Sequence, residues 1–275
     1  MIEIKGVHEY LRWRKRFPTV WCSGCGNGTI MGALVQAVMD LEIPKDDIAL
    51  VSGIGCSSRI PAYIDFNTLH TTHGRALAFA TGIKLARPSM KVIVVSGDGD
   101  ALAIGGNHFI HACRRNIGIT MILVNNAIYG MTGGQVAPTT PIGAKAHTMP
   151  YGNIEPPFDP VQLAMASGAT FVARTTTYAV VQTTNFIKKA IQHDGFSMID
   201  VITQCPILYG RLNNMPDPKK MLMWQKENAI PLAKAQNMKP EELEGKIITG
   251  IFKDEKRKEY TMAYAELVNR VKSEE

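Results

Sequence analysis

The chain of 275 residues lacks the features of a membrane or secreted protein. It contains no run of about 18 apolar residues, so a transmembrane helix is not expected. The opening residues Met1-Ile2-Glu3-Ile4-Lys5 do not form the hydrophobic segment of a signal peptide. We therefore expect a cytoplasmic protein that makes no membrane contact.

A nucleic-acid groove is also missing from the sequence pattern. The formal net charge is +6 and the pI is about 9.0, but the basic residues are scattered. No Lys/Arg-rich stripe alternates with aromatic residues, so nucleic acid is not expected as a partner. The positive balance is compatible with anionic ligands such as a diphosphate, carboxylates or coenzyme A, and with an acidic electron carrier.

An even set of cysteines, as a disulfide framework requires, is absent as well. The chain has five, Cys22, Cys25, Cys56, Cys113 and Cys205, and an odd number in a chain without a leader argues against such a framework. Cys113 lies in a segment with helical spacing, which is typical of a packed structural thiol. The other four follow predicted strands or lie in glycine-rich loops, where their sulfurs can converge.

Three interpretations of those four cysteines compete. They are unrelated buried thiols, a four-cysteine zinc site, or a [4Fe–4S] cluster. Structural zinc usually uses two close pairs, and here only Cys22 and Cys25 are close in sequence. A [4Fe–4S] cluster needs four thiolates and tolerates scattered ligands. Spacing alone leaves zinc and iron–sulfur open.

The apolar pattern predicts an α/β protein with a doubly wound, mostly parallel sheet. Residues 1–210 are expected to form the core domain, and residues 211–275 an extension that packs on the core or on a partner. The extension includes helical patterns over 240–246 and 260–272, the second with an apolar stripe of Met262, Leu267, Val268 and Val271. Core strands are predicted near residues 48–53, 92–97, 119–124, 170–173 and 197–203, and helices near 27–41, 73–86, 104–116, 160–167 and 178–193.

Polar side chains follow two of these strands. Gly97-Asp98-Gly99 ends one strand, and Asn125-Asn126 ends the next, about 25 residues further on. In a parallel sheet both lie at the edge where ligands bind. Their oxygens suit Mg²⁺, and the glycines allow a diphosphate to approach the backbone. The alternative is an ordinary turn in which Asp98 caps a helix.

The spacing is similar to the signature of thiamine diphosphate (ThDP) enzymes. This resemblance implies that Asp98 and Asn126 bind Mg²⁺ through their side chains and Ile128 through its backbone carbonyl. The expected cofactor contacts, taken together, are Ile54, Gly55, Cys56, Ser57, His73, Gly97, Asp98, Gly99, Asp100, Asn126, Gly130, Met131 and Thr132.

Five motifs together resemble the β subunit of 2-oxoacid:ferredoxin oxidoreductases. They are Trp21-Cys22-Ser23-Gly24-Cys25-Gly26, Gly53-Ile54-Gly55-Cys56-Ser57, His70-Thr71-Thr72-His73-Gly74-Arg75-Ala76, Gly97-Asp98-Gly99-Asp100 and the segment from Asn125 to Gln135. The match runs in order over about residues 10–210. It implies that residues 1–210 bind ThDP and one [4Fe–4S] cluster, with Cys22, Cys25, Cys56 and Cys205 as its ligands.

The resemblance also implies a reaction. ThDP accepts the electron pair released when a 2-oxoacid loses CO₂, and a nearby cluster can remove the electrons one at a time, which redox-inactive zinc cannot do. The net reaction converts a 2-oxoacid, coenzyme A and oxidised ferredoxin into acyl-CoA, CO₂ and reduced ferredoxin, and it can run in reverse.

Two residues are candidates for a catalytic role. His73 lies on a glycine-punctuated segment that opens a helix, where it could face the diphosphate and the substrate; the alternative is an ordinary residue at a helix start. Arg59, three residues after Cys56, could grip a substrate carboxylate, because a guanidinium group matches a carboxylate in shape and charge. A surface ion pair is the alternative for Arg59.

An expected glutamate is missing. ThDP needs a carboxylate at its aminopyrimidine ring, and no Glu occurs between Glu42 and Glu155. We expect an α subunit to supply this Glu together with part of the substrate and coenzyme A site, in a dimer of αβ heterodimers that passes electrons to ferredoxin. The chain alone should then be inactive.

The basic Arg59 and the histidines favour 2-oxoglutarate, with succinyl-CoA as product. Pyruvate and branched-chain 2-oxoacids are alternatives. Two other classes compete with this function: a non-redox ThDP decarboxylase subunit with structural cysteines, and a zinc-stabilised binding module with a degenerate nucleotide fold.

Overall fold

The computed structural model describes residues 6–12 and 17–274, in which eight strands form one sheet. In chain order they are β1 (Ile48–Ser52), β2 (Asn67–His70), β3 (Lys91–Gly97), β4 (Ile119–Asn125), β5 (Phe171–Thr176), β6 (Ser197–Ile202), β7 (Ala229–Pro231) and β8 (Ile247–Asp254). Their order across the sheet is β2-β1-β3-β4-β6-β5-β8-β7. All neighbours are parallel except β5 and β8. The predicted doubly wound, mostly parallel fold is confirmed.

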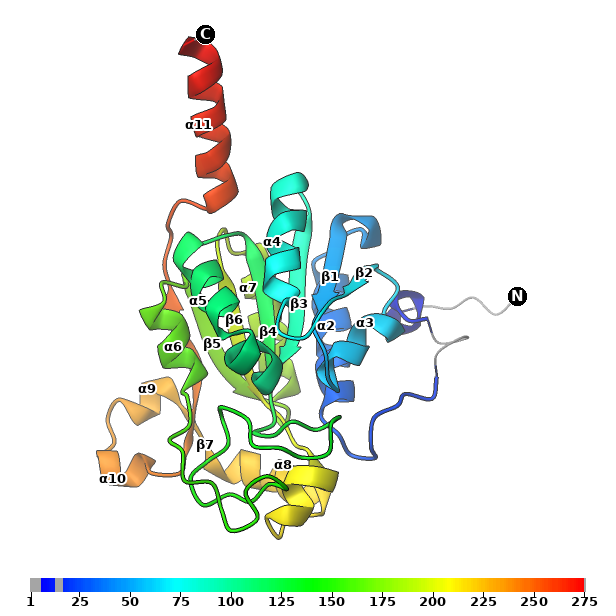
Figure 1. The fold of residues 1–275 in the computed structure, drawn as a ribbon, viewed down its shortest axis with the longest axis vertical. Helices are drawn as coiled ribbons and strands as arrows, with labels where there is room; N and C mark the ends of the chain where they lie inside the picture. Colours follow the sequence, from blue (N-terminus) through cyan, green and yellow to red (C-terminus); the bar gives the residue numbers. More distant parts are fainter. Residues whose placement is uncertain (1–5, 13–16, 275) are drawn as a thin grey trace.

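Helices cover both faces of the sheet (Figure 1). They are α2 (Asn27–Asp40), α3 (Ile60–Tyr63), α4 (Ala76–Ala86), α5 (Gly106–Arg115), α6 (Pro160–Ala166), α7 (Val180–Gln192), α8 (Pro218–Asn228), α9 (Leu232–Ala235), α10 (Pro240–Leu243) and α11 (Tyr260–Glu274). The five core strands and five core helices predicted from periodicity are all present.

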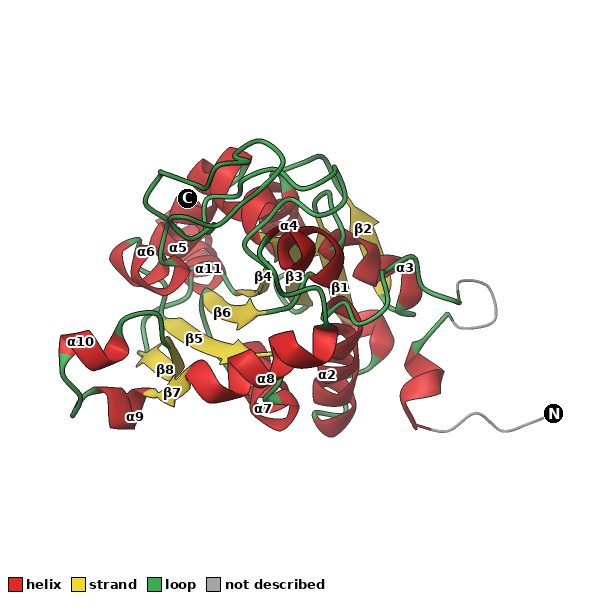
Figure 2. Ribbon diagram, turned by 90° about the horizontal axis from the view of Figure 1, so that it is seen from below, coloured by secondary structure: helices red, strands yellow, loops and turns green. Residues whose placement is uncertain are grey.

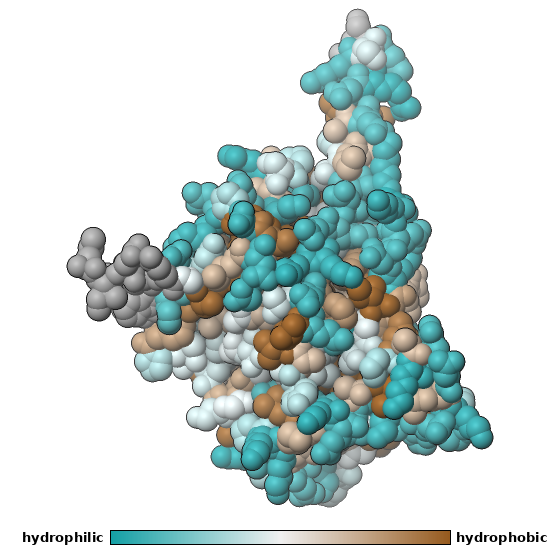
Figure 3. Space-filling view, turned by 180° about the vertical axis from the view of Figure 1, so that it is seen from behind, coloured by the Kyte–Doolittle hydropathy of each residue, from teal (hydrophilic) through white to brown (hydrophobic). Residues whose placement is uncertain are grey.

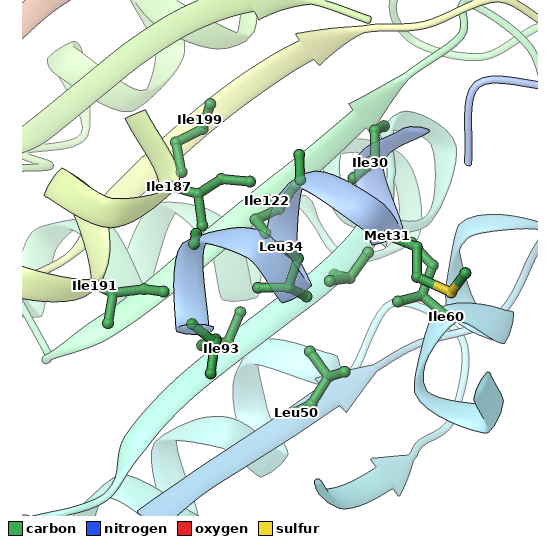
Figure 4. Close-up of a cluster of buried hydrophobic side chains, with 14 of the residues drawn as sticks. Ile30, Met31, Leu34, Leu50, Ile60, Ile93, Ile122, Ile187, Ile191 and Ile199 are labelled. Atoms are coloured by element: carbon green, nitrogen blue, oxygen red, sulfur yellow. The ribbon is translucent and has the colours of Figure 1, made fainter. Parts of the chain in front are cut away.

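The core consists of two apolar layers, one on each face of the sheet. Successive residues of a strand point to opposite faces, so Ile93 packs with α2 and α7 while Val94 packs with α4 and α5. Figure 4 shows the first layer, where Leu34 of α2 and Ile187 of α7 lie against the strands. Burial on both faces explains why these strands read as continuous Val/Ile runs.

The carboxyl ends of β1, β3 and β4 meet at one edge. Ser52 is in register with Val95, and Gly97 with Val124, so the loops that follow these strands lie together. Residues 126–159 contain no helix or longer strand and extend beyond this edge, as the green loops of Figure 2 show. Backbone and side-chain hydrogen bonds hold this long loop, including three from the Asn153 amide group to carbonyl oxygens.

Part of the C-terminal extension joins the sheet. Strand β8 pairs with β5, and β7 with β8. The apolar pattern missed these strands and β2, because they are short or lie towards the sheet edges and carry no continuous buried run. The helix predicted over 260–272 is present as α11 and projects from the body (Figure 1). Of its predicted stripe, Met262, Leu267 and Val271 are exposed.

On the side opposite to Figure 1, the apolar residues that the structure describes are scattered over the surface. Figure 3 shows separate brown patches on a mainly hydrophilic surface. Within the described residues, no helix has both the length and the apolar character needed to cross a membrane.

Candidate functional site

Asp98 lies buried at the end of β3, where the chain turns into the short helix η4 (Gly99–Ile104). Its Oδ1 accepts a hydrogen bond from the Gly99 backbone N–H at 3.0 Å, and its Oδ2 accepts one from the Thr139 hydroxyl. Burial raises the pKa of this carboxyl group to about 7, because removal from water disfavours the charged form. A cation at this position would compensate for that cost.

The two asparagines at the end of β4 have different surroundings. Asn125 is buried, and its amide group donates to Asp200 Oδ1 at 3.1 Å within the core. Asn126 instead lines a cavity together with Asp98. Its Oδ1 accepts a hydrogen bond from the Ile128 N–H at 3.2 Å, which holds Ile128 beside Asn126. The set of Asp98, Asn126 and the Ile128 carbonyl therefore offers the hard oxygen donors that Mg²⁺ prefers.

The cavity gathers most of the expected cofactor contacts from three separate segments. Its lining consists of Ile54, Gly55, Cys56, Ser57, Gly97, Asp98, Gly99, Asp100, Val124, Asn126, Ile128, Tyr129 and Gly130. The other expected cofactor contacts, His73, Met131 and Thr132, are not part of this lining, and neither is the catalytic candidate Arg59. These assignments of cofactor contacts stay predictions.

Tyr129 closes one wall of the cavity. Its hydroxyl donates to the Gly99 carbonyl at 2.9 Å. A Cβ atom at Gly99 would lie 2.4 Å from the Tyr129 ring, so only glycine allows the ring to pack on this turn. The second glycine of the Gly97-Asp98-Gly99 motif is therefore required by protein packing as well as by access to a diphosphate.

Four of the five cysteines surround one region. The turn from Cys22 to Cys25 is tied to the segment before Cys205, because Gln204 donates to the Gly24 carbonyl at 3.0 Å and accepts from the Gly26 N–H at 3.2 Å through its own carbonyl. On the opposite side, the Trp21 indole N–H donates to the Cys56 carbonyl at 2.7 Å. Cys113 lies apart from them, fully buried among the apolar residues of α5 and the sheet.

The electrostatics of the four thiols favour a positively charged group between them. Burial raises the pKa of Cys56 to about 12, and Cys25, Cys205 and Cys22 each raise it further by repulsion. Burial also raises the pKa values of Cys25 and Cys205, and repulsion within the cysteine set adds to both shifts. If all four were deprotonated, four thiolates this close would need the compensating charge of a metal group.

Hydrogen-bond donors face the sulfurs. The Asn27 amide group lies 3.2 Å from Cys25 Sγ, and the backbone of Leu208 and Tyr209 faces Cys205. In the described part of the chain, no three His, Cys, Asp or Glu side chains converge on a point where one ion could sit. A [4Fe–4S] cluster places each thiolate on a different iron atom, so it does not require such convergence.

The two candidate catalytic residues lie at the rim of the cavity. His73 Nδ1 is 2.5 Å from Asp100 Oδ1, and its ring packs edge-on against Tyr129 with centroids 6.1 Å apart. Arg59 is exposed, and its guanidinium group contacts the Met131 sulfur at 3.9 Å. Among the described residues, Arg59 forms no ion pair. The Thr132 hydroxyl donates to the Gln135 side chain.

Sequence reasoning missed three residues of the site. The Thr139 hydroxyl donates to Asp98, the Tyr129 ring lines the cavity, and the Trp21 indole N–H donates to the Cys56 carbonyl. Tyr129 and Trp21 lie within the motifs that resemble the family. Residue spacing in those motifs does not reveal what the two side chains contact. Thr139 lies in a Gly/Pro-rich stretch without periodicity, and no sequence signal marks it.

Replacing Thr139 with Val should weaken ThDP–Mg²⁺ binding about tenfold, because loss of a group that orients a metal ligand typically costs 10- to 100-fold. Cofactor affinity can be measured from quenching of tryptophan fluorescence. Thr139→Ser keeps the hydroxyl and is the matched control, which should bind as the wild type does. Equal affinities for the Val and Ser variants would show that the hydroxyl does not orient Asp98.

The fold and cavity define a ThDP-binding protein, and comparison with known proteins agrees. The family model described as "Thiamine pyrophosphate enzyme, C-terminal TPP binding domain" matches residues 53–201. This range includes β3, β4 and every cavity residue given above.

Two similar proteins identify the family of ThDP-binding proteins to which the chain belongs. The chain is 53% identical to the "2-oxoglutarate synthase subunit KorB" of Methanocaldococcus jannaschii over 98% of this chain and 100% of that protein. It is 45% identical to the "2-oxoacid:ferredoxin oxidoreductase subunit beta" of Saccharolobus solfataricus over 85% of this chain and 76% of that protein. It thus belongs to the family of 2-oxoacid:ferredoxin oxidoreductase β subunits, as its motifs predicted.

A solved structure is similar over nearly the whole chain. It is a 2-oxoglutarate:ferredoxin oxidoreductase from Magnetococcus marinus with 2-oxoglutarate, coenzyme A and succinyl-CoA bound. The TM-score is 0.86 at 33% identity, covering 98% of this chain and 91% of that one.

Proposed function

We propose that this chain is the β subunit of an enzyme that oxidatively decarboxylates 2-oxoglutarate. Coenzyme A takes the succinyl group, and ferredoxin takes the electrons. Four relatives named as 2-oxoglutarate synthase subunits are 51–53% identical to this chain, and the Magnetococcus enzyme was solved with this substrate.

One observation supports the redox part of the proposal: two of the four thiols lie beside the proposed diphosphate site, at Gly130. A Cβ atom at Gly130 would lie 3.3 Å from Cys56 Sγ, 3.9 Å from Asn126 Nδ2 and 4.0 Å from Cys205 Sγ. Cys56 itself lines the cavity with Asp98. A non-redox decarboxylase has no use for four thiols beside its cofactor, whereas single-electron transfer requires short distances between the two groups.

The residues present fit the implied groups. Asp98, Asn126 and the Ile128 carbonyl would hold Mg²⁺ and, through it, the diphosphate. Cys22, Cys25, Cys56 and Cys205 would hold a [4Fe–4S] cluster, and the Asn27 amide group already donates to Cys25 Sγ at 3.2 Å. When bound, ThDP supplies the electron sink for decarboxylation, and the cluster supplies one-electron transfer.

The remaining residues bind, orient and exclude water. Tyr129 and the loop of residues 126–159 shield the buried Asp98 from bulk water, which strengthens its interaction with a cation. Trp21 and Gln204 hold the cysteine-bearing loops in place. Arg59 at the rim offers an uncommitted guanidinium group for a substrate carboxylate, and His73 offers its outer ring nitrogen.

The cavity lacks the carboxylate that the aminopyrimidine ring of ThDP needs, and this absence supports a partner subunit that supplies it. No Glu is among the residues that line the cavity. The purified chain should therefore be at least about 100-fold less active than the complex with its α subunit, since a positioned proton-transfer group contributes roughly 10²- to 10⁴-fold. The measurement is 2-oxoacid-dependent viologen reduction, with and without added partner. Full turnover by the chain alone would exclude a shared site.

The substrate assignment is tested by the same assay on the assembled enzyme. We expect 2-oxoglutarate to have the highest kcat/KM, ahead of pyruvate and branched-chain 2-oxoacids. Arg59→Leu should reduce kcat/KM for 2-oxoglutarate about tenfold or more, because a charge-assisted hydrogen bond contributes about 1.5–3 kcal/mol. An equal kcat/KM for 2-oxoglutarate in wild type and variant would show that Arg59 does not bind the substrate.

A further inference from the structure

Asp100 has an arrangement that a cofactor contact or a helix cap does not require. It lies two residues after Asp98 and is 3% exposed. Its Oδ1 faces His73 Nδ1 at 2.5 Å, the Gly74 N–H at 2.7 Å and the Ile54 N–H at 3.3 Å. Its Oδ2 accepts from the Ser96 hydroxyl at 2.5 Å. Three segments of the site are thus tied to one carboxylate.

The partners of Asp100 restrict its chemistry. The two backbone N–H groups can only donate, and Ser96 donates along a short contact. An acceptor-only group, an ionised carboxylate, satisfies all of them. The loop before Ile54 closes directly over it, since a Cβ atom at Gly53 would lie 2.0 Å from Oδ2. The carboxylate is therefore held rigidly and cannot turn away from His73.

A fixed acceptor at Nδ1 determines which nitrogen of the imidazole carries the proton. In neutral histidine the hydrogen bond at one ring nitrogen sets the tautomer. Asp100 requires a proton on Nδ1 and so leaves Nε2 as the acceptor. Within the described residues no hydrogen bond occupies Nε2, and the side chain of His73 is 36% exposed beside Tyr129 at the cavity rim.

We propose that Asp100 is a positioning residue that orients His73 in the Nδ1–H form, with Nε2 available to the 2-oxoacid or to the cofactor at the cavity rim. In this role Asp100 acts through His73, which its Oδ1 contacts at Nδ1. The role of His73 at the ligand rests on the proposed function, whereas its orientation and tautomer follow from the contacts of Asp100 alone.

The direct test is the tautomer of His73. The full chain is labelled with ¹⁵N-histidine, assembled with its unlabelled α subunit and studied by solid-state ¹⁵N NMR above pH 7.5, with His73→Gln to assign the resonance. We expect His73 to be at least about nine-tenths Nδ1–H. A His73 that carries its proton on Nε2 in the wild-type enzyme overturns the proposal, whatever the variants do.

The second test replaces the carboxylate. Asp100→Asn should reduce the Nδ1–H fraction to about half or less. In the complex it should lower kcat at least tenfold with the KM for ThDP within about threefold of wild type. The double variant Asp100→Asn/His73→Gln should have the same kcat as His73→Gln alone, because both changes remove the same interaction. Additive losses, or an unchanged tautomer in Asp100→Asn, contradict the proposal.

A control separates this role from simple support of the fold. Ser96→Ala removes one hydrogen bond to Oδ2 but keeps the charge, so His73 should stay Nδ1–H and kcat should fall less than threefold. If the assembled wild-type enzyme reduces no acceptor with any 2-oxoacid, the proposed function fails, while the NMR result still decides the positioning role.

Discussion

Asp98→Asn should abolish cofactor-dependent activity while leaving the fold intact. In the assembled enzyme we expect viologen reduction to fall at least about 100-fold, because removal of a group that merely orients a metal ligand already costs 10- to 100-fold. ThDP affinity should fall in parallel, since Mg²⁺ links the carboxylate to the diphosphate. Both quantities can be measured on one preparation, by stopped-flow assay and by fluorescence titration.

The stability of the same variant provides the control. Burial raises the pKa of Asp98 to about 7. A carboxyl group whose pKa is higher in the folded state favours folding below its unfolded pKa, and that contribution disappears as the pH rises towards 7. Without Mg²⁺, Asp98→Asn should therefore melt at the same or a higher temperature than wild type at pH 8. A large fall in Tm would attribute the lost activity to misfolding instead.

Cys56→Ala should remove the iron–sulfur centre. We expect iron to fall from about four atoms per chain to less than one, with loss of absorbance near 400 nm, since a [4Fe–4S] cluster uses four cysteine ligands. Electron transfer to viologen should fall at least about 100-fold. The measurements are metal analysis and the dithionite-bleachable spectrum, both of the anaerobically purified complex.

Cys113→Ala is the matched control for this prediction. Cys113 is fully buried in the apolar layer of α5, so its truncation should lower the Tm through lost packing and leave the iron content unchanged. A wild-type protein with one zinc and no iron would contradict the cluster and favour the structural use of these cysteines. Loss of iron in Cys113→Ala with retention in Cys56→Ala would contradict the ligand assignment.

Much of the site was predictable because its residues lie directly after strong sequence patterns. The apolar runs before Gly97 and Asn125 identify two buried parallel strands, and the topology of such strands brings Asp98 and Asn126 to one edge. The distinction between Asn125 and Asn126 came from the ThDP signature. The structure gives its physical reason, because Asn125 turns into the core to bind Asp200.

Contacts of the irregular segments were not predictable in the same way. Thr139 reaches Asp98 from a loop without periodicity, and Asp100 binds His73 across 27 positions of sequence. Strands β7 and β8 extend the sheet beyond β5, and β8 pairs with β5 in the antiparallel direction. Such contacts depend on where a turn places a side chain in space, which neither hydrophobic period nor residue spacing encodes.

The sequence by itself determined the class of this protein, namely a parallel α/β domain with polar oxygen donors after two strands, four cysteines in loops that can converge and no Glu between Glu42 and Glu155. Those features depend on residue type and order along the strands. Only the tertiary structure decided that Cys56 and Asn126 flank the same glycine and that Asp100 holds His73. The physical reason is that distances between loops are set by the packing of the elements beneath them, and this packing exists only in the folded chain.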